Sequence, residues 1–178
     1  MNKVIHGAVR RDLQRFVAAL TTFPPGDVAR ARRLGEAWAN FDAQLTEHHE
    51  GEHRIAWPAL REVGVSEELL REFDRAHEAM ADALAKARVA MGSLTVAPGD
   101  AEIATALAAF EELERVTVRH LEHEEAEVEP VYQANRDAPA IKAMGRAFGR
   151  VDPRQGGQFF AWILDGITPE AKAVLSHD

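Results

Sequence analysis

The sequence predicts an all-α protein, an up-down-up-down four-helix bundle with additional short C-terminal helices. Apolar residues recur at steps of three and four along four long segments, which is the period of a helix with one buried face. None of these segments shows the alternation typical of a strand. The links between them are short, as in a bundle of neighbouring antiparallel helices. A chain of 178 residues can bury a proper core as one domain.

Each of the four segments carries one stripe of inward-facing residues. The first stripe is His6, Val9, Leu13, Phe16 and Leu20. The second is Leu34, Trp38, Phe41, Leu45, His48, Glu52 and Ile55. The third is Leu69, Phe73, His77, Met80, Leu84 and Met91. The fourth is Ile103, Phe110, Leu113, Thr117, His120, Glu124 and Val131.

Three breaks separate the stripes, and each ends in a residue that can cap the next helix. The breaks are "TTFPPGD" at 21–27, "VGVS" at 63–66 and "TVAPGD" at 95–100. Asp, Ser and Thr side chains accept hydrogen bonds from the free N–H groups of a first helical turn. We therefore predict helix N-caps at Asp27, Ser66 and Asp100.

Residues 135–178 lie beyond the fourth stripe, and we expect a helical extension packed on a bundle formed by residues 1–134. Its apolar segment "QFFAWILDGI" is too hydrophobic to stay in water. It can form a lid on the bundle, a homodimer surface, or a wall along an access path to the core. The expected elements are a helix at 139–150, a turn at 151–157, a helix at 158–167, and a helix at 168–177 with Thr168 as N-cap and Pro169 in its first turn.

The composition excludes several classes of function. The formal net charge is −8, so the phosphates of a nucleic acid would be repelled. The chain contains no cysteine, which excludes disulfides, thiolate metal sites and cysteine nucleophiles. The N-terminus lacks a signal-peptide pattern, and the longest strongly apolar run is too short to span a bilayer. We expect a cytoplasmic protein that binds neither nucleic acid nor membrane.

Ionisable residues interrupt all four apolar stripes. A buried charge is unfavourable unless it is paired or bound to a metal. One buried histidine is commonly an ordinary core residue with hydrogen-bond partners, but a set spread over four helices indicates a common site. The set consists of His6, His48, Glu52, His77, His120 and Glu124.

Two of the interruptions repeat one pattern. His48 precedes Glu52 by four residues, and His120 precedes Glu124 by four, so each pair lies on one helix face. The pairs are 72 residues apart, and this offset also aligns the two prolines that follow them at positions 58 and 130. Each helix therefore offers a metal one imidazole and one carboxylate, and we expect the prolines to end or kink the helices just beyond.

A rival register exists within the same clusters. His49 lies four residues before His53, and His123 lies four before Glu127. These residues fall outside the apolar stripes, and the 72-residue offset gives them no repeated ligand pair. We interpret His49, His53 and His123 as solvated residues or as partners behind the metal ligands.

The complete pattern resembles the hemerythrin-like, HHE cation-binding domains. The similar segments are "HGAVRRDL" at 6–13, "HHEGEHRIAWPAL" at 48–60, "RAHEAM" around His77, and "HLEHEEAEVEP" at 120–130. The resemblance covers roughly residues 1–134. It implies two iron ions inside a four-helix bundle, bridged by two carboxylates and an oxo or hydroxo group.

Carried over by position, the resemblance makes Glu52 and Glu124 the bridging carboxylates. His6 and His48 would serve one iron, and His77 and His120 the other. Imidazole and carboxylate ligands also suit zinc or manganese as substitutes.

Oxygen-carrying members of this family have five histidines, two of them four apart in the third helix, and one iron keeps an open position. Here the residues four before and four after His77 are Phe73 and Ala81, so only four histidines align. Both irons would then keep an open position. The sole tyrosine, Tyr132, is interpreted as a packing residue at the bundle end or as an extra ligand or redox partner.

The expected function is therefore that of a di-iron protein that binds or reacts with O2, NO or peroxide in redox response, stress response or sensing. The four-histidine count favours ligand reactivity over reversible oxygen carriage. The alternatives are a peroxide-removing enzyme, an iron store, and a plain helical interaction bundle. An electron donor is an expected partner.

Overall fold

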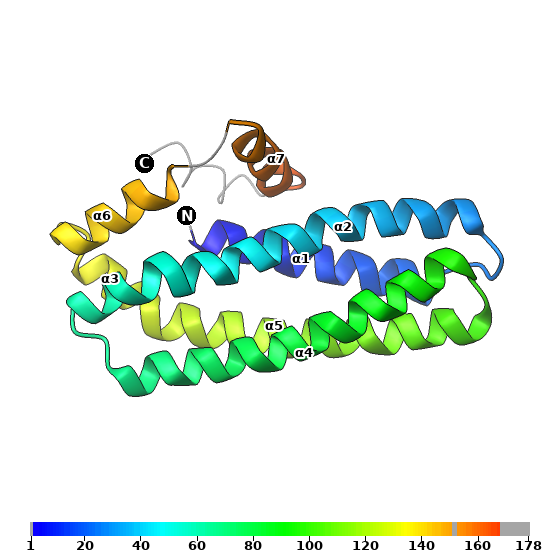
Figure 1. The fold of residues 1–178 in the computed structure, drawn as a ribbon, viewed down its shortest axis with the longest axis horizontal. Coiled ribbons are helices and arrows are strands. Elements are labelled where there is room, and N and C mark those ends of the chain that lie inside the picture. Colours follow the sequence, from blue (N-terminus) through cyan, green and yellow to red (C-terminus); the bar gives the residue numbers. More distant parts are fainter. Residues whose placement is uncertain (1, 151–152, 168–178) are drawn as a thin grey trace.

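The computed structural model describes residues 2–150 and 153–167, and every regular element in them is helical. The prediction of an all-α protein is therefore confirmed. Four long helices lie side by side along the molecule (Figure 1). They are α1 (Asn2–Thr21), α2 (Val28–Gly51), α4 (Glu67–Val96) and α5 (Asp100–Ala134).

Four shorter elements complete the described chain. A π-helical turn η1 (Glu52–Ala56) and helix α3 (Trp57–Glu62) continue α2 without a break. Helix α6 (Pro139–Phe148) contacts α3 and η1 at one end of the molecule, and α7 (Pro153–Leu164) contacts α1 (Figure 1). No helix among the described residues combines the length and apolar character needed to cross a membrane.

The helix starts follow the predicted caps with one exception. The side chain of Asp27 accepts a hydrogen bond from the backbone N–H of Arg30, and that of Ser66 accepts one from Leu69, which confirms both caps. The prediction for Asp100 is wrong, because α5 begins at this residue and Gly99 is its N-cap. The Asp100 carboxylate lies instead in the first turn, where the helix dipole favours a negative charge.

The C-terminal extension differs from the prediction at the start of α7. The expected turn at 151–157 is wrong from position 153 onward, since α7 already begins at Pro153, a favourable residue for a first helical turn. Trp162 and Ile163 of α7 are buried, and the Trp162 indole N–H donates to Asp12 of α1 at 2.7 Å. The expected helix at 168–177 lies outside the described residues.

Apolar side chains form two separate core clusters. The larger cluster fills most of the space between the long helices and includes the aromatic group Phe16, Trp38, Phe41 and Phe110. The smaller cluster surrounds α3 and consists of Ala56, Trp57, Leu60, Leu70, Phe73 and Val128. On α2 and α4 the ionisable residues of the stripes lie between the positions of the two clusters, and on α5 Leu121 of the larger cluster falls between His120 and Glu124.

Candidate metal centre

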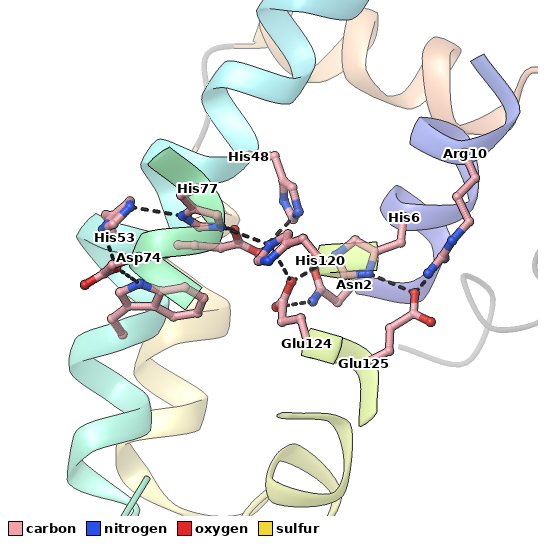
Figure 2. Close-up of polar contacts among 12 residues, drawn as sticks. Asn2, His6, Arg10, His48, His53, Asp74, His77, His120, Glu124 and Glu125 are labelled. Atoms are coloured by element: carbon pink, nitrogen blue, oxygen red, sulfur yellow. Dashed lines mark hydrogen bonds and ion pairs between the residues drawn. The ribbon is translucent and has the colours of Figure 1, made fainter. Parts of the chain in front are cut away.

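All six predicted site residues come together in the interior. Figure 2 labels all of them except Glu52. α1 contributes His6, α2 and η1 contribute His48 and Glu52, α4 contributes His77, and α5 contributes His120 and Glu124. Glu52 and Glu124 are only 3% and 1% exposed, so neither carboxyl is solvated by bulk water. Burial of this many polar groups requires hydrogen-bond partners or a cation.

The π-helical turn begins at Glu52. The Trp57 N–H bonds to the Glu52 carbonyl five residues earlier, and the next residue, Pro58, has no N–H to donate. A wider turn accommodates a proline that would otherwise clash with the preceding turn of an α-helix. Of the two expected effects of the prolines, a helix end or a kink, the first is wrong: the chain stays helical through Pro58, and Pro130 lies inside α5. π-Turns of this kind occur frequently at functional sites.

Each carboxylate lies between imidazoles of the two predicted halves of the site. One oxygen of Glu52 is 3.2 Å from His48 Nε2, and the other is 3.3 Å from His77 Nε2. Glu124 Oε2 is 3.4 Å from His6 Nε2 and 3.8 Å from His120 Nε2. A carboxylate in this position can bridge two metal ions.

Three groups of ligand atoms result, with the atoms of each group within 4.8 Å of one another. The outermost is His53, Asp74 and His77, and the two inner groups overlap. The first inner group is His6, His48, Glu52 and Glu124. The second inner group is His49, Glu52, His77 and His120. Glu52 belongs to both inner groups, so the arrangement suits a pair of adjacent cations that share a ligand.

His49 was predicted to be solvated or to lie behind a ligand, and the structure corrects this. Its ring centroid is 4.5 Å from that of His77, and its Nε2 atom is buried without a hydrogen-bond partner. α2 presents a second stripe toward α4, in which Asp42 and Thr46 both bond Arg88. His49 continues this stripe one turn further on. Because the stripe is polar, a search for apolar periodicity missed it.

His53 and His123 lie outside the inner groups, as the sequence interpretation expected. His123 is 41% exposed and 4.0 Å from Glu72. His53 is partly exposed and lies behind His77, with its Nε2 atom 3.0 Å from His77 Nδ1 (Figure 2). Neither residue adds a ligand atom to the inner groups.

Two hydrogen bonds and one ion-pair contact behind His77 orient its ring. Asp74 Oδ1 accepts the Trp57 indole N–H at 2.9 Å and lies 3.3 Å from His53 Nδ1. With the proton of His53 on Nδ1, beside the Asp74 carboxylate, its Nε2 accepts the Nδ1–H of His77. This arrangement leaves the lone pair of His77 Nε2 directed at the site, which a metal ligand requires.

His6 is oriented in the same way on the opposite side (Figure 2). Its Nδ1 is 2.9 Å from Glu125 Oε1, which also accepts a bond from Arg10 at 2.8 Å. Burial opposes ionisation of Glu125, but the bonds from His6 and Arg10 outweigh it and lower the pKa of this carboxyl to about 2. The ionised Glu125 accepts the Nδ1–H of His6 and leaves its Nε2 free for a cation.

Burial shifts the pKa values of several inner residues in the direction that favours their neutral forms. It raises the pKa of Glu52 to about 8, and burial together with the Glu52 charge raises the pKa of Glu124 to about 8. Burial lowers the pKa of His77 to about 4 and, with the neighbouring histidines, that of His120 to about 3. The pKa of His49 also falls well below its usual value, chiefly through burial. A bound cation instead favours the ionised forms of the Glu52 and Glu124 carboxyls.

The unpaired polar atoms test whether these residues fit a metal. Most buried polar atoms in proteins have a hydrogen-bond partner, so a cluster of unpaired ones needs an explanation. Those of the inner groups are Nε2 of His6, His48 and His49, Nδ1 of His120, both oxygens of Glu52, and Oε2 of Glu124. Nitrogen and oxygen donors of this kind suit iron, manganese or zinc, so the residues fit the implied metals.

Metal binding is expected to release about two protons per chain at pH 7. Glu52 and Glu124 hold protons below their pKa of about 8 and must lose them to bind a cation. His77 and His120 are already neutral at this pH and do not compete. Apparent affinity should therefore rise from pH 6 to 8 and level off above. Calorimetric zinc titrations in buffers of different ionisation enthalpy measure the protons released. Release of none at pH 7 would contradict the assignment.

The variant His49→Ala is expected to weaken metal binding at least about tenfold, a loss typical of removing a group that supports a metal. His123→Ala, which alters a half-exposed histidine outside the inner groups, is the matched control and should bind like the wild type. Competition with a coloured chelator gives both dissociation constants. Equal affinities for the two variants would return His49 to the role that the sequence suggested.

Tyr132 and α6 lie at the α3 end of the molecule, next to the site. Tyr132 packs against the smaller apolar cluster, and burial beside Glu124 and Glu52 raises its pKa. The Phe148 ring of α6 lies against Gly51, where an added Cβ atom would come within 2.9 Å of it. The absence of a side chain at Gly51 therefore allows α6 to approach the helix segment that carries Glu52.

Comparison with known proteins gave one result. The family model described as the hemerythrin HHE cation-binding domain matches residues 3–144, which include every residue of the inner groups. Neither the curated proteins nor the solved structures that were compared gave a match.

Proposed function

Because this chain belongs to the hemerythrin HHE cation-binding domain family, we propose that its inner histidines and carboxylates hold two iron ions. Zinc or manganese can occupy the same nitrogen and oxygen ligands. A carboxylate-bridged iron pair supplies redox chemistry and a position for a small exogenous ligand. The protein would use it to bind or react with O2, NO or peroxide in redox response, stress response or sensing.

The observation that carries this proposal is the placement of the two carboxylates. Glu52 contacts an imidazole of each predicted half, and so does Glu124. A single ion would not require two carboxylates that each contact imidazoles of both halves of the site. Six or more ligand residues also exceed what one closed tetrahedral site requires.

The distribution of imidazoles supports one open position rather than two. The group with His49 has three histidines, whereas the group with His6 and His48 has two. Five histidines equal the number that the sequence comparison assigned to oxygen carriers, so a low histidine count no longer argues against reversible oxygen binding. The fifth histidine here is His49, and its position differs from that in the oxygen carriers. It adjoins His48 on α2 instead of lying one turn from His77 on α4.

Metal analysis of protein expressed with added iron tests the proposal, and about two ions per chain are expected. A reproducible value of one or none would contradict the paired centre. Reduction without oxygen, followed by cycles of oxygen addition and removal, then separates the candidate functions. Reversible spectral change indicates a ligand-binding protein, steady peroxide consumption indicates an enzyme, and uptake of many more ions indicates a store.

Other features of the expected molecule belong to the same proposal. The contacts His6–His48 and Phe16–Trp38 show that α1 and α2 run antiparallel, which supports an up-down-up-down bundle. We place the bundle in residues 1–134 and the extension in 135–178. A cytoplasmic location, an electron donor, and a homodimer formed through the extension complete the proposal.

A further inference from the structure

One buried polar atom outside the inner groups also lacks a partner. Among the unpaired buried side-chain atoms of the described residues, Thr117 Oγ1 is the only one that belongs to neither group of ligand atoms. Thr117 is fully buried on α5. An unpaired buried hydroxyl destabilises a folded protein, so its retention here needs a reason.

Other helical threonines satisfy their hydroxyls locally. Thr21 and Thr105 each donate to the carbonyl four residues earlier, which is the usual bond for threonine within a helix. Thr46 accepts a bond from Arg88. Thr117 makes neither kind of bond, and its hydroxyl remains available to a group that is not part of the protein.

Thr117 lies one helical turn from the metal ligands. It precedes His120 by three residues and Glu124 by seven, which places all three on one face of α5. Side chains on a helix lean toward its N-terminus, so the ligand atoms of His120 and Glu124 lie over the turns before them. These atoms therefore approach the level of Thr117.

The rest of this level is apolar. The contacts His6–His48 and His77–His120 lie at the site, and those around Phe16 lie further along the bundle. In the direction from the site toward Phe16, residue numbers increase along α1 and α4 and decrease along α2 and α5. Moving three residues in that direction from the site histidine of each helix gives a set of four buried residues: Val9, Leu45, Met80 and Thr117. Thr117 thus provides the one hydroxyl in an otherwise apolar layer beside the site.

We propose that the Thr117 hydroxyl hydrogen-bonds to the small exogenous ligand held at the metal centre and favours ligands that can accept such a bond. The class includes small anions such as azide and hydroperoxide. This inference rests on the proposed function. A hydroxyl donating to an anion in a dry apolar layer forms a strong, directional bond, and it selects against ligands that cannot accept one.

The test compares iron-loaded wild type, Thr117→Val and Thr117→Ser, with Thr105→Val as the control on the exposed side of α5. Azide affinity should fall about tenfold in T117V and remain close to the wild-type value in T117S and T105V. The infrared stretch of bound azide should shift in T117V and return in T117S. The metal-free T117V protein should melt at a higher temperature, because valine removes the unpaired hydroxyl.

The outcomes distinguish this inference from the proposed function. Wild type that holds no metal overturns both. Wild type that holds metal and binds azide, with T117V unchanged in affinity and infrared stretch, overturns only the role of Thr117. Metal-loaded wild type that fails to bind azide also overturns that role alone. Less metal in T117V than in wild type would overturn it as well, by showing that the hydroxyl serves the metals themselves.

Discussion

The variants Glu52→Gln and Glu124→Gln are each expected to lose both metal ions at concentrations that saturate the wild type. Each carboxylate contacts an imidazole in both halves of the site, so its replacement removes a ligand from two ions at once. Changes behind a ligand commonly weaken metal binding by 10- to 100-fold, and loss of a shared anionic ligand should exceed about 100-fold. Glutamine keeps the shape but cannot supply the charge.

Glu50→Gln and Glu127→Gln are the matched controls, since these exposed acids lie on the same helical segments within three residues of Glu52 and Glu124. Elemental analysis after gel filtration measures the metal retained by all four variants. Retention of a full complement by either inner variant, or equal losses in the controls, would contradict the bridging role.

Metal removal is expected to lower the melting temperature by roughly 8–16 °C, the second large effect. Ligand at a thousandfold excess over Kd stabilises the native state by about 4 kcal/mol. For a chain of this size, 1 kcal/mol corresponds to about 2–4 °C. Chelation also leaves the buried oxygens of Glu52 without a partner.

Calorimetric melting of the chelated and metal-loaded protein measures this shift. Glu52→Gln provides the control, because a variant that holds no metal should melt at the same temperature with and without chelator. An unchanged wild-type melting temperature after confirmed metal loss would show that the site contributes nothing to stability and is not a buried centre.

Apolar periodicity predicted the long helices and six of the seven residues of the inner groups, because both depend on which face of a helix is buried. The stripe that contains His48 and Glu52 follows this rule. His49 does not, since its neighbours on the α4-facing side are polar. Adjacent residues on a helix, such as His48 and His49, point about 100° apart. Only the positions of the neighbouring helices show that both side chains reach the site.

Backbone details were harder to predict from the sequence. Pro58 suggested a helix end or a kink, but a π-turn accommodates its missing N–H and the chain stays helical. Asp100 and Gly99 are both plausible caps, and the choice depends on backbone torsion angles that composition does not specify. The two glycines near the start of α7 suggested a turn, yet the buried Trp162 and Ile163 anchor this helix on the bundle.

The separation of the two apolar clusters has a consequence for cooperativity. The smaller cluster around α3 is a modest unit, and the layer of buried imidazoles and carboxyls divides it from the larger cluster. Without a cation, the unpaired polar atoms of that layer are expected to make it a weak junction. With ions bound, ligands from α1, α2, α4 and α5 are held to a common centre, and the junction becomes a strong one. We therefore expect metal occupancy to determine whether the α3 end opens independently, as a local unfolding unit, or only together with the whole molecule.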